Sequence, residues 1–149
     1  MLGKQMPGIG VEQILDKSLT GAFLMQTYGA EKRIPLDNTA EHAQKNVRSF
    51  CMTNGKLLDT ETLGEHAQLA ALIRAEDINP TVLLINFGET GGKFGGGGKT
   101  EIRVRAYAKE GMQKQHSAEK VIDKLESFLT GNDGVLDAIL KEFELYPVK

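Results

Sequence analysis

Cysteine and aromatic residues are scarce in this sequence. Cys51 is the only cysteine among 149 residues, so no disulfide can form within the chain, which suits a reducing compartment or a domain that needs no covalent cross-link. Tryptophan is absent and aromatic residues make up 6% of the chain, so we expect a core of Leu, Ile, Val and Ala. A lone cysteine in a mixed apolar stretch is usually a small core residue, and we expect that role for Cys51.

Signals for membranes and for secretion are also missing. No run of about 18 apolar residues occurs, so we expect no membrane-spanning segment. Residues 1–7 lack the apolar stretch of a secretory signal. We therefore expect the protein to remain in the cytoplasm of the cell that makes it.

Charge of either sign shows little excess. The chain has 18 Lys and Arg, 20 Asp and Glu, and a formal net charge of -2. Broad capture of nucleic acid needs a dense basic face, which this balance does not suggest. The hydrophobic share of 40% and the charged share of 26% are those of a globular protein, and the length suits one domain.

Hydrophobic periodicity and turn residues predict the order of elements. Helical spacing of apolar residues predicts helices over 10–20, 62–75 and 117–130, the last capped by Ser117, and a further helix from Asp133. Asn54-Gly55 predicts a small hairpin between 47–53 and 56–58. The remaining segments are a short apolar run at 22–25, either strand or helix, a loop over 29–39 marked by Gly29 and Pro35, and strands at 81–87 and 102–108.

The two clearest strands define the predicted fold class. Residues 81–87 contain four consecutive aliphatic residues, which favours a strand covered on both faces, whereas 102–108 begins by alternating apolar with charged residues. We expect these strands to pair antiparallel. The sequence therefore predicts one α/β (α+β) domain over 1–149, with a small, mainly antiparallel sheet packed by amphipathic helices. Residues 29–61 are expected to form either an insertion or an extended arm.

The connection between these strands is rich in glycine and allows three interpretations. Gly98-Lys99-Thr100 matches the end of a phosphate-binding P-loop, but residue 93, where that motif needs its first glycine, is lysine, and a strand rather than a helix is expected to follow. The alternatives are a flexible hairpin loop and an assembly loop that orders against a partner through Lys93, Phe94 and Lys99. Ordering each glycine costs conformational entropy, so a partner would have to supply the stabilising contacts.

Catalytic and metal-binding patterns are not found. Glu41-His42 and Glu65-His66 share a tetrapeptide, but neither has the spacing of a zinc signature. Cys51 lies in no nucleophile motif. We expect no catalytic residue, no metal ion and no cofactor, and therefore a protein that is not an enzyme. Arg103 and Arg105 fall on one face of a strand with Glu101, either as a basic stripe or as a solvated face that forms salt bridges between subunits.

One stretch, Leu63–Gly131, resembles the tail terminator and neck (head–tail joining) proteins of tailed phages, particularly the Mu-like contractile-tail group. The residues that carry the resemblance are an alanine- and leucine-rich segment at 67–73, read as helical, and a strand that follows a proline and precedes Gly88. A variable hairpin, the alternating strand 100–108 and a helix closing with Leu129-Thr130-Gly131 complete the pattern.

The resemblance implies a structural virion protein. Such a protein forms a closed ring of identical copies, usually a hexamer, which caps the tail tube, ends its polymerisation and joins the tail to the head connector. Its partners would be tail tube and sheath proteins and a head-completion protein, with DNA passing through the lumen without specific binding. The implied location is the neck of the virion, assembled in the host cytoplasm. The alternative that the sequence leaves open is a small phosphate- or nucleotide-binding module that uses Gly91–Thr100.

Overall fold

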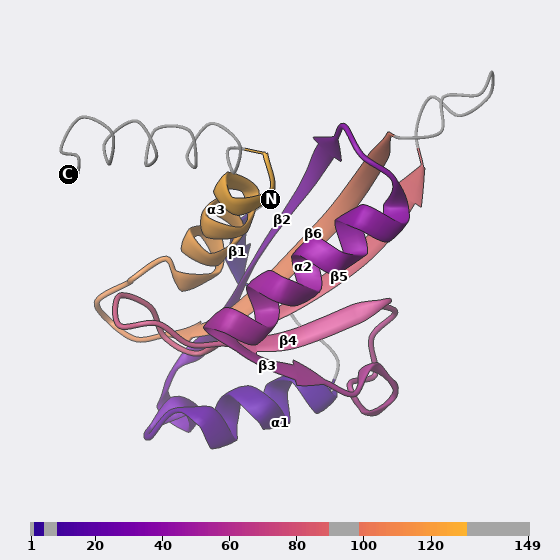
Figure 1. Ribbon diagram of the computed structural model, residues 1–149. Helices are drawn as coiled ribbons and strands as arrows, with labels where there is room; N and C mark the ends of the chain where they lie inside the picture. The colour runs from indigo at the N-terminus through magenta and orange to yellow at the C-terminus, as the bar shows by residue number, and fades with distance from the viewer. Residues whose placement is uncertain (1, 5–8, 90–98, 131–149) are drawn as a thin grey trace, which may run out of the picture.

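The computed structural model describes residues 2–4, 9–89 and 99–130 (Figure 1). Strands alternate irregularly with three α-helices and two 3-10 helices. The elements are β1 (Leu2–Lys4), α1 (Ile9–Ser18), η1 (Ala22–Leu24), β2 (Gln26–Leu36), α2 (Ala40–Asn54), β3 (Gly55–Leu58), η2 (Thr60–Thr62), β4 (Leu69–Ile73), β5 (Thr81–Glu89), β6 (Thr100–Glu110) and α3 (Ser117–Leu129).

A single antiparallel sheet forms the centre of the described residues. Its six strands follow the order β1-β2-β6-β5-β4-β3, and every neighbouring pair is antiparallel. The β5–β6 hairpin pairs Thr81 with Ala108 at one end and Glu89 with Thr100 at the other. The predicted fold class, a small antiparallel sheet packed by amphipathic helices, is therefore confirmed, as is the antiparallel pairing of its two clearest strands.

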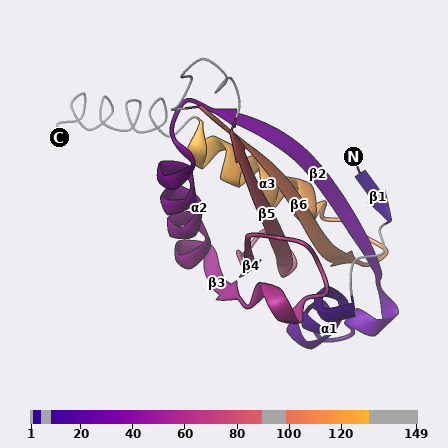
Figure 2. The same cartoon turned by 90° about the vertical axis from the view of Figure 1, so that its right-hand side faces the viewer.

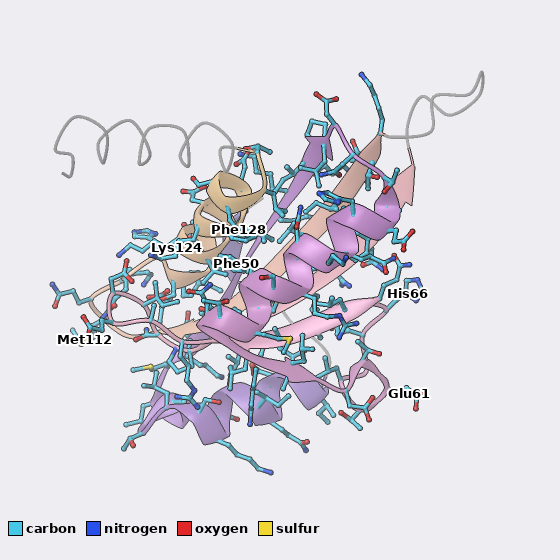
Figure 3. The ribbon with its side chains drawn as sticks, viewed as in Figure 1. Phe50, Glu61, His66, Met112, Lys124 and Phe128 are labelled. Atoms are coloured by element: carbon cyan, nitrogen blue, oxygen red, sulfur yellow. The ribbon has the colours of Figure 1, made fainter. Side chains whose placement is uncertain are left out.

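Helices cover both faces of this sheet (Figures 1 and 2). The larger core lies beneath α2 and α3, where Val47 and Leu125 meet inward side chains such as Ile85 and Val104. Phe50 of α2 and Phe128 of α3 meet there with ring centroids 5.6 Å apart (Figure 3). A smaller core lies beneath α1 and contains Val11, Leu15, Leu63, Ala70, Leu72, Val82 and Leu84. Burial of apolar side chains on both faces is the main force that holds these layers together.

The predicted helix over 62–75 is wrong. Residues 60–62 form η2 and Leu69–Ile73 form β4, in which all five residues are buried. Leu69, Ala71 and Ile73 face the larger core, whereas Ala70 and Leu72 face the smaller one. A strand covered on both faces is apolar at every position, so its sequence also satisfies a helical spacing.

The predicted loop over 29–39 is wrong as well. Gly29 and Pro35 both lie within β2, which pairs with β6 at every position from Gln26 to Leu36. Pro35 lies beyond the residues of β2 that pair with β1, Tyr28–Ala30. No described strand pairs with the outer side of β2 there, and edge strands are where a sheet tolerates proline. Within residues 29–61 lie most of β2, all of α2 and β3, and part of the larger core, so this segment is packed into the sheet.

The hairpin predicted around Asn54-Gly55 is a helix followed by a strand. Residues 47–53 belong to α2, whose buried stripe consists of Ala43, Val47, Phe50 and Cys51. Thr39 caps this helix, since its side-chain oxygen accepts a hydrogen bond of 3.1 Å from the His42 N–H. Gly55 then begins β3, which pairs with β4. The helical stripe, which spans the nine residues from Ala43 to Cys51, outweighs a two-residue turn signal.

The remaining helices agree with their sequence patterns except at their ends. Both α1 and α3 lie where periodicity predicts them, and residues 22–25 begin with a 3-10 helix. Ser117 does not cap α3 but is its first residue, preceded by His116 at a φ of 57°. The Glu110 carboxylate accepts hydrogen bonds of 2.8 Å from the N–H groups of Gln115 and Ser117 instead. The helix predicted from Asp133 lies outside the described residues.

Cys51 is a core residue, as its context predicts. Its side chain is fully buried, and desolvation raises the pKa of the thiol from 9.0 to about 12. At pH 8 the thiolate fraction would then be about 1000-fold lower than at the unperturbed pKa, because each pKa unit is a factor of ten. We expect alkylation by iodoacetamide to be at least that much slower in the folded chain than in urea. Equal rates in both conditions, measured by mass spectrometry, would contradict this assignment.

Candidate assembly surface

The sequence singles out five residues for assembly, and the structure describes three of them. Lys93 and Phe94 lie outside the described residues. Lys99 immediately precedes β6, and its Nζ is 3.6 Å from Asp37 Oδ1, with both side chains largely exposed. Such an exposed pair contributes little to stability. Arg103 and Arg105 both lie on β6, on the face opposite α2 and α3.

Arg103 and Arg105 belong to a group of charged residues that we call the charged sheet face. It comprises Glu31 and Arg33 of β2 with Glu101, Arg103 and Arg105 of β6. The strand register places Arg33 beside Arg103 and Glu31 beside Arg105, and all five side chains point the same way because successive residues alternate between faces. The alternation in 101–105 correctly predicts that Arg103 and Arg105 share a face with Glu101. The ion pairs that the structure shows on this face lie within the chain, and salt bridges between subunits stay a prediction.

The ion pairs on the charged sheet face run diagonally between the strands. Arg103 binds Glu31 with two hydrogen bonds, from Nε to Oε2 at 2.7 Å and from Nη2 to Oε1 at 3.3 Å. The hydrogen bond from Arg103 lowers the pKa of Glu31 below its usual value, so this pair favours folding above the unfolded pKa and loses that effect as the pH falls. Arg33 and Glu101 approach to 3.4 Å. Diagonal pairing separates the neighbouring like charges of Arg33 and Arg103.

Arg105 is the least exposed arginine of this face. Its Nη1 is 2.9 Å from Glu65 Oε1, and the two side chains are 11% and 14% exposed. Its Nη2 donates to the backbone oxygen of His66 at 2.5 Å. Both contacts lie in the connection between η2 and β4, so Arg105 fixes this connection against the sheet.

Thr100 and Lys99 show what the P-loop-like tripeptide does here. Thr100 is fully buried, and its hydroxyl donates a hydrogen bond of 2.7 Å to the Asn38 backbone oxygen. A strand, β6, follows the glycine-rich segment, as the sequence predicts, and it begins at Thr100, two residues before the predicted start. A P-loop instead leads into a helix whose N-terminus holds the phosphate. The hydroxyl that would bind a metal ion in a P-loop is thus committed to the backbone.

A second polar cluster, which was not predicted from the sequence, lies on the same side of the sheet. Lys109 of β6, whose side chain is 7% exposed, lies 3.3 Å from both Glu12 Oε2 and Asp16 Oδ1 of α1. Thr27 of β2 also donates a hydrogen bond to Glu12. The cluster ties α1 to the sheet. Its signal is the spacing itself, because residues four apart share a helix face and Lys109 continues the alternation of Arg103 and Arg105.

Across residues 2–4, 9–89 and 99–130, no group of three or more His, Cys, Asp or Glu side chains has an arrangement that could hold a metal ion. Within the same ranges, no helix has both the length and the apolar character needed to cross a bilayer.

Comparisons with protein-family models, with curated proteins and with solved structures give no match. No relative therefore assigns a role to these side chains.

Proposed function

We propose that this chain is a structural protein of the phage neck. It forms a ring that caps the tail tube, ends its polymerisation and joins the tail to the head connector, and it is not an enzyme. The observation that carries the proposal is the central β5–β6 hairpin, whose paired ends Glu89 and Thr100 are joined by the glycine-rich residues 90–99. This hairpin and the following α3 supply most of the pattern that resembles tail terminators. The segment 67–73 departs from that pattern, because it contains a strand.

The ring consists of identical copies, six in the arrangement that the resemblance implies. Tail tube and sheath proteins bind one side and a head-completion protein the other. In this arrangement Lys93, Phe94 and Lys99 contact a neighbouring copy or the tube, because a glycine-rich segment can order against a partner at the cost of its own entropy. The complex belongs to the virion neck and is assembled in the host cytoplasm.

Charge balance on the charged sheet face agrees with DNA passing through the lumen without specific binding. Each arginine of this face has a carboxylate partner within the chain: Arg33 has Glu101, Arg103 has Glu31 and Arg105 has Glu65. Retention of DNA requires surplus positive charge that releases counterions. A face of matched pairs would therefore let DNA slide past it.

The alternative, a nucleotide- or phosphate-binding module, gains no support from the described residues. The Thr100 hydroxyl bonds to Asn38 and the Lys99 ammonium lies near Asp37. We therefore retain only the structural role. A thermal-shift scan with nucleotides tests the ligand-binding alternative. We expect no rise of the protein's melting temperature at saturating nucleotide concentration.

Electron microscopy of tail tubes tests the proposed function. Purified protein added to tubes of the virus that encodes it should appear as a ring at one tube end, and mass spectrometry should detect the chain in purified virions. Phe94→Ala should reduce the fraction of capped tubes, whereas Met52→Ala, a change at an exposed residue of α2, should not. Absence of the chain from virions together with uncapped tubes would refute the neck assignment.

A further inference from the structure

A few large apolar side chains are strongly exposed on the surface of the described residues. Among the described residues, the large apolar side chains that are strongly exposed are Ile9 (76%), Leu24 (79%), Met52 (61%) and Met112 (102%). Ile9 begins α1, and Leu24 ends η1, which follows α1. Single exposed apolar residues are common on protein surfaces. Two of these four, however, border the same hollow.

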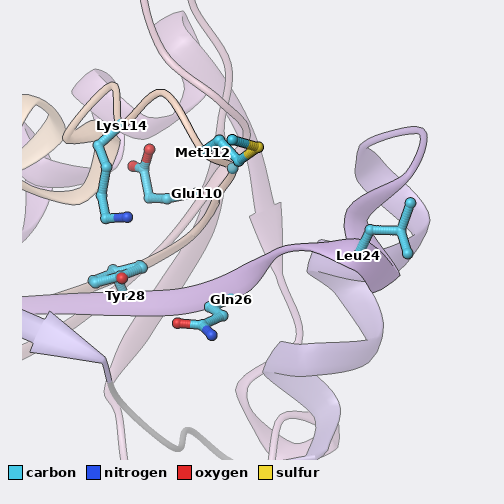
Figure 4. A pocket seen from close by; sticks show the side chains of 7 residues that line it. Leu24, Gln26, Tyr28, Glu110, Met112 and Lys114 are labelled. Carbon is cyan, nitrogen blue, oxygen red and sulfur yellow. The ribbon is translucent and has the colours of Figure 1, made fainter.

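Leu24 and Met112 line a hollow of about 230 Å³ together with Tyr28, Glu110 and Lys114 (Figure 4). The Lys114 Nζ lies 4.9 Å from the centre of the Tyr28 ring. The Glu110 carboxylate is already bound by the N–H groups at the start of α3. Gln26 and Gly111 also line the hollow, so its lining is mixed, with Leu24 and Met112 as its apolar side chains. Lys114 forms no ion pair with any described residue and leaves one cation available.

The surroundings of Ile9 have the opposite charge. The first turn of α1 packs against η2, since a Cβ atom at Gly10 would lie 2.4 Å from the Thr62 backbone oxygen. Asp59 and Glu61, both exposed, flank this contact and form no ion pair with any described residue. Figure 3 shows Glu61 and Met112 at opposite ends of the molecule. An exposed apolar side chain with acidic neighbours therefore lies far from a hollow of mixed lining that holds a cation.

We propose that these two ends bind each other in successive copies of the chain. Ile9 of one copy inserts between Leu24 and Met112 of the next, and the acidic η2 segment approaches Lys114. The inference builds on the proposed function, in which copies form a ring. Because the two surfaces differ and lie at opposite ends, the contact is heterologous, the kind that closes into a ring when its rotation permits. Complementary charges orient the encounter and the apolar insertion supplies affinity.

Mixed cysteine variants test this contact directly. Ile9→Cys and Met112→Cys chains, mixed and mildly oxidised, should give a disulfide-linked dimer with one chain of each kind, identified by mass spectrometry. Cys51 is fully buried and contributes little background. The matched control is Ile9→Cys mixed with Met52→Cys. Met52 is also an exposed methionine (61%), but it lies on α2, so this mixture should give no specific dimer.

Charge reversal provides a second measurement, by sedimentation velocity. Ile9→Lys places a cation against Lys114, and Met112→Glu places an anion against Glu61, so each should raise the dissociation constant of self-association at least about tenfold. Combining both changes in one chain should restore most of the affinity, because the introduced charges then attract. Met52→Glu should leave the dissociation constant unchanged.

The outcomes separate this contact from the neck assignment. Rings on tube ends that form equally well with Ile9→Lys and Met112→Glu, without a mixed disulfide, would overturn the contact and leave the neck proposal standing. A wild-type chain that stays monomeric even in the presence of tail tubes would overturn both. A mixed disulfide, weaker association of each single variant and recovery in the double variant would support the contact.

Discussion

Gly55→Ala is expected to lower the free energy of unfolding by about 3–5 kcal/mol, a large part of the stability of a domain of this size. Gly55 joins α2 to β3, and a Cβ atom there would lie 1.9 Å from the Leu72 backbone oxygen and 2.8 Å from the Leu72 carbonyl carbon. Both atoms belong to the backbone of β4, so no side-chain rotation can relieve the overlap. The strand β3 would have to move away from β4, which would open both cores at that edge.

Urea denaturation with linear extrapolation measures this effect, and Gly88→Ala is the matched control. A Cβ atom at Gly88 would meet only the Glu101 backbone oxygen, at the ordinary contact distance of 3.8 Å. We expect Gly88→Ala to change stability by less than about 1 kcal/mol. Equal losses in the two variants would mean that the approach of β3 to β4 is looser than the structure shows.

Arg105→Ala is expected to cost about 2–4 kcal/mol of folding free energy, whereas Arg103→Ala should cost less than about 1 kcal/mol. Both arginines pair with a glutamate, but the Arg105–Glu65 pair is 11% and 14% exposed and the Arg103–Glu31 pair is 40% and 33% exposed. A desolvated pair loses more when one partner is removed. Arg105→Ala also removes the hydrogen bond to the His66 backbone oxygen.

Thermal and urea unfolding of the two variants measure the two losses of stability. Limited proteolysis shows which segment of the chain opens. Because Arg105 fixes the connection between η2 and β4, we expect limited proteolysis of Arg105→Ala to cut within residues 59–68 faster than in the wild type. Arg103→Ala should show the wild-type cleavage pattern. A larger loss of folding free energy in Arg103→Ala than in Arg105→Ala would contradict this prediction. It would mean that the ion pairs between β2 and β6 stabilise the chain more than the Arg105–Glu65 pair does.

The sequence predicts the part of the fold that depends on local patterns. The strands β5 and β6 and the helix α3 carry strong periodicity, and the hairpin joins neighbours along the chain, so little besides their own residues decides their structure. The segments 29–39 and 62–75 are different. In β2, pairing with β6 along its whole length overrides Gly29 and Pro35, and in β4 burial on both faces makes helix and strand patterns indistinguishable.

The sequence also predicts the part of the candidate surface that depends on local patterns. Alternation in β6 places Arg103 and Arg105 on one face of the sheet, which the structure confirms, although Arg105 is far less exposed than Arg103. Their partners were not foreseeable, because Glu31 lies in β2 and Glu65 in the connection before β4, and both segments have a different conformation from the one predicted. A wrong local structure therefore conceals the electrostatic contacts that depend on it.

The outer edge of β2 carries features that discourage strand addition by another chain. Beyond Ala30, no described strand pairs with that edge, and its sequence there includes two cations, Lys32 and Arg33, followed by Pro35. Charge and a missing donor both discourage a foreign strand from adding to a sheet. In the proposed neck assembly, copies at high local concentration would then stay apart until their side chains recognise each other. The backbone offers little template for amyloid-like growth, so closure of the proposed ring would have less competition from uncontrolled polymerisation.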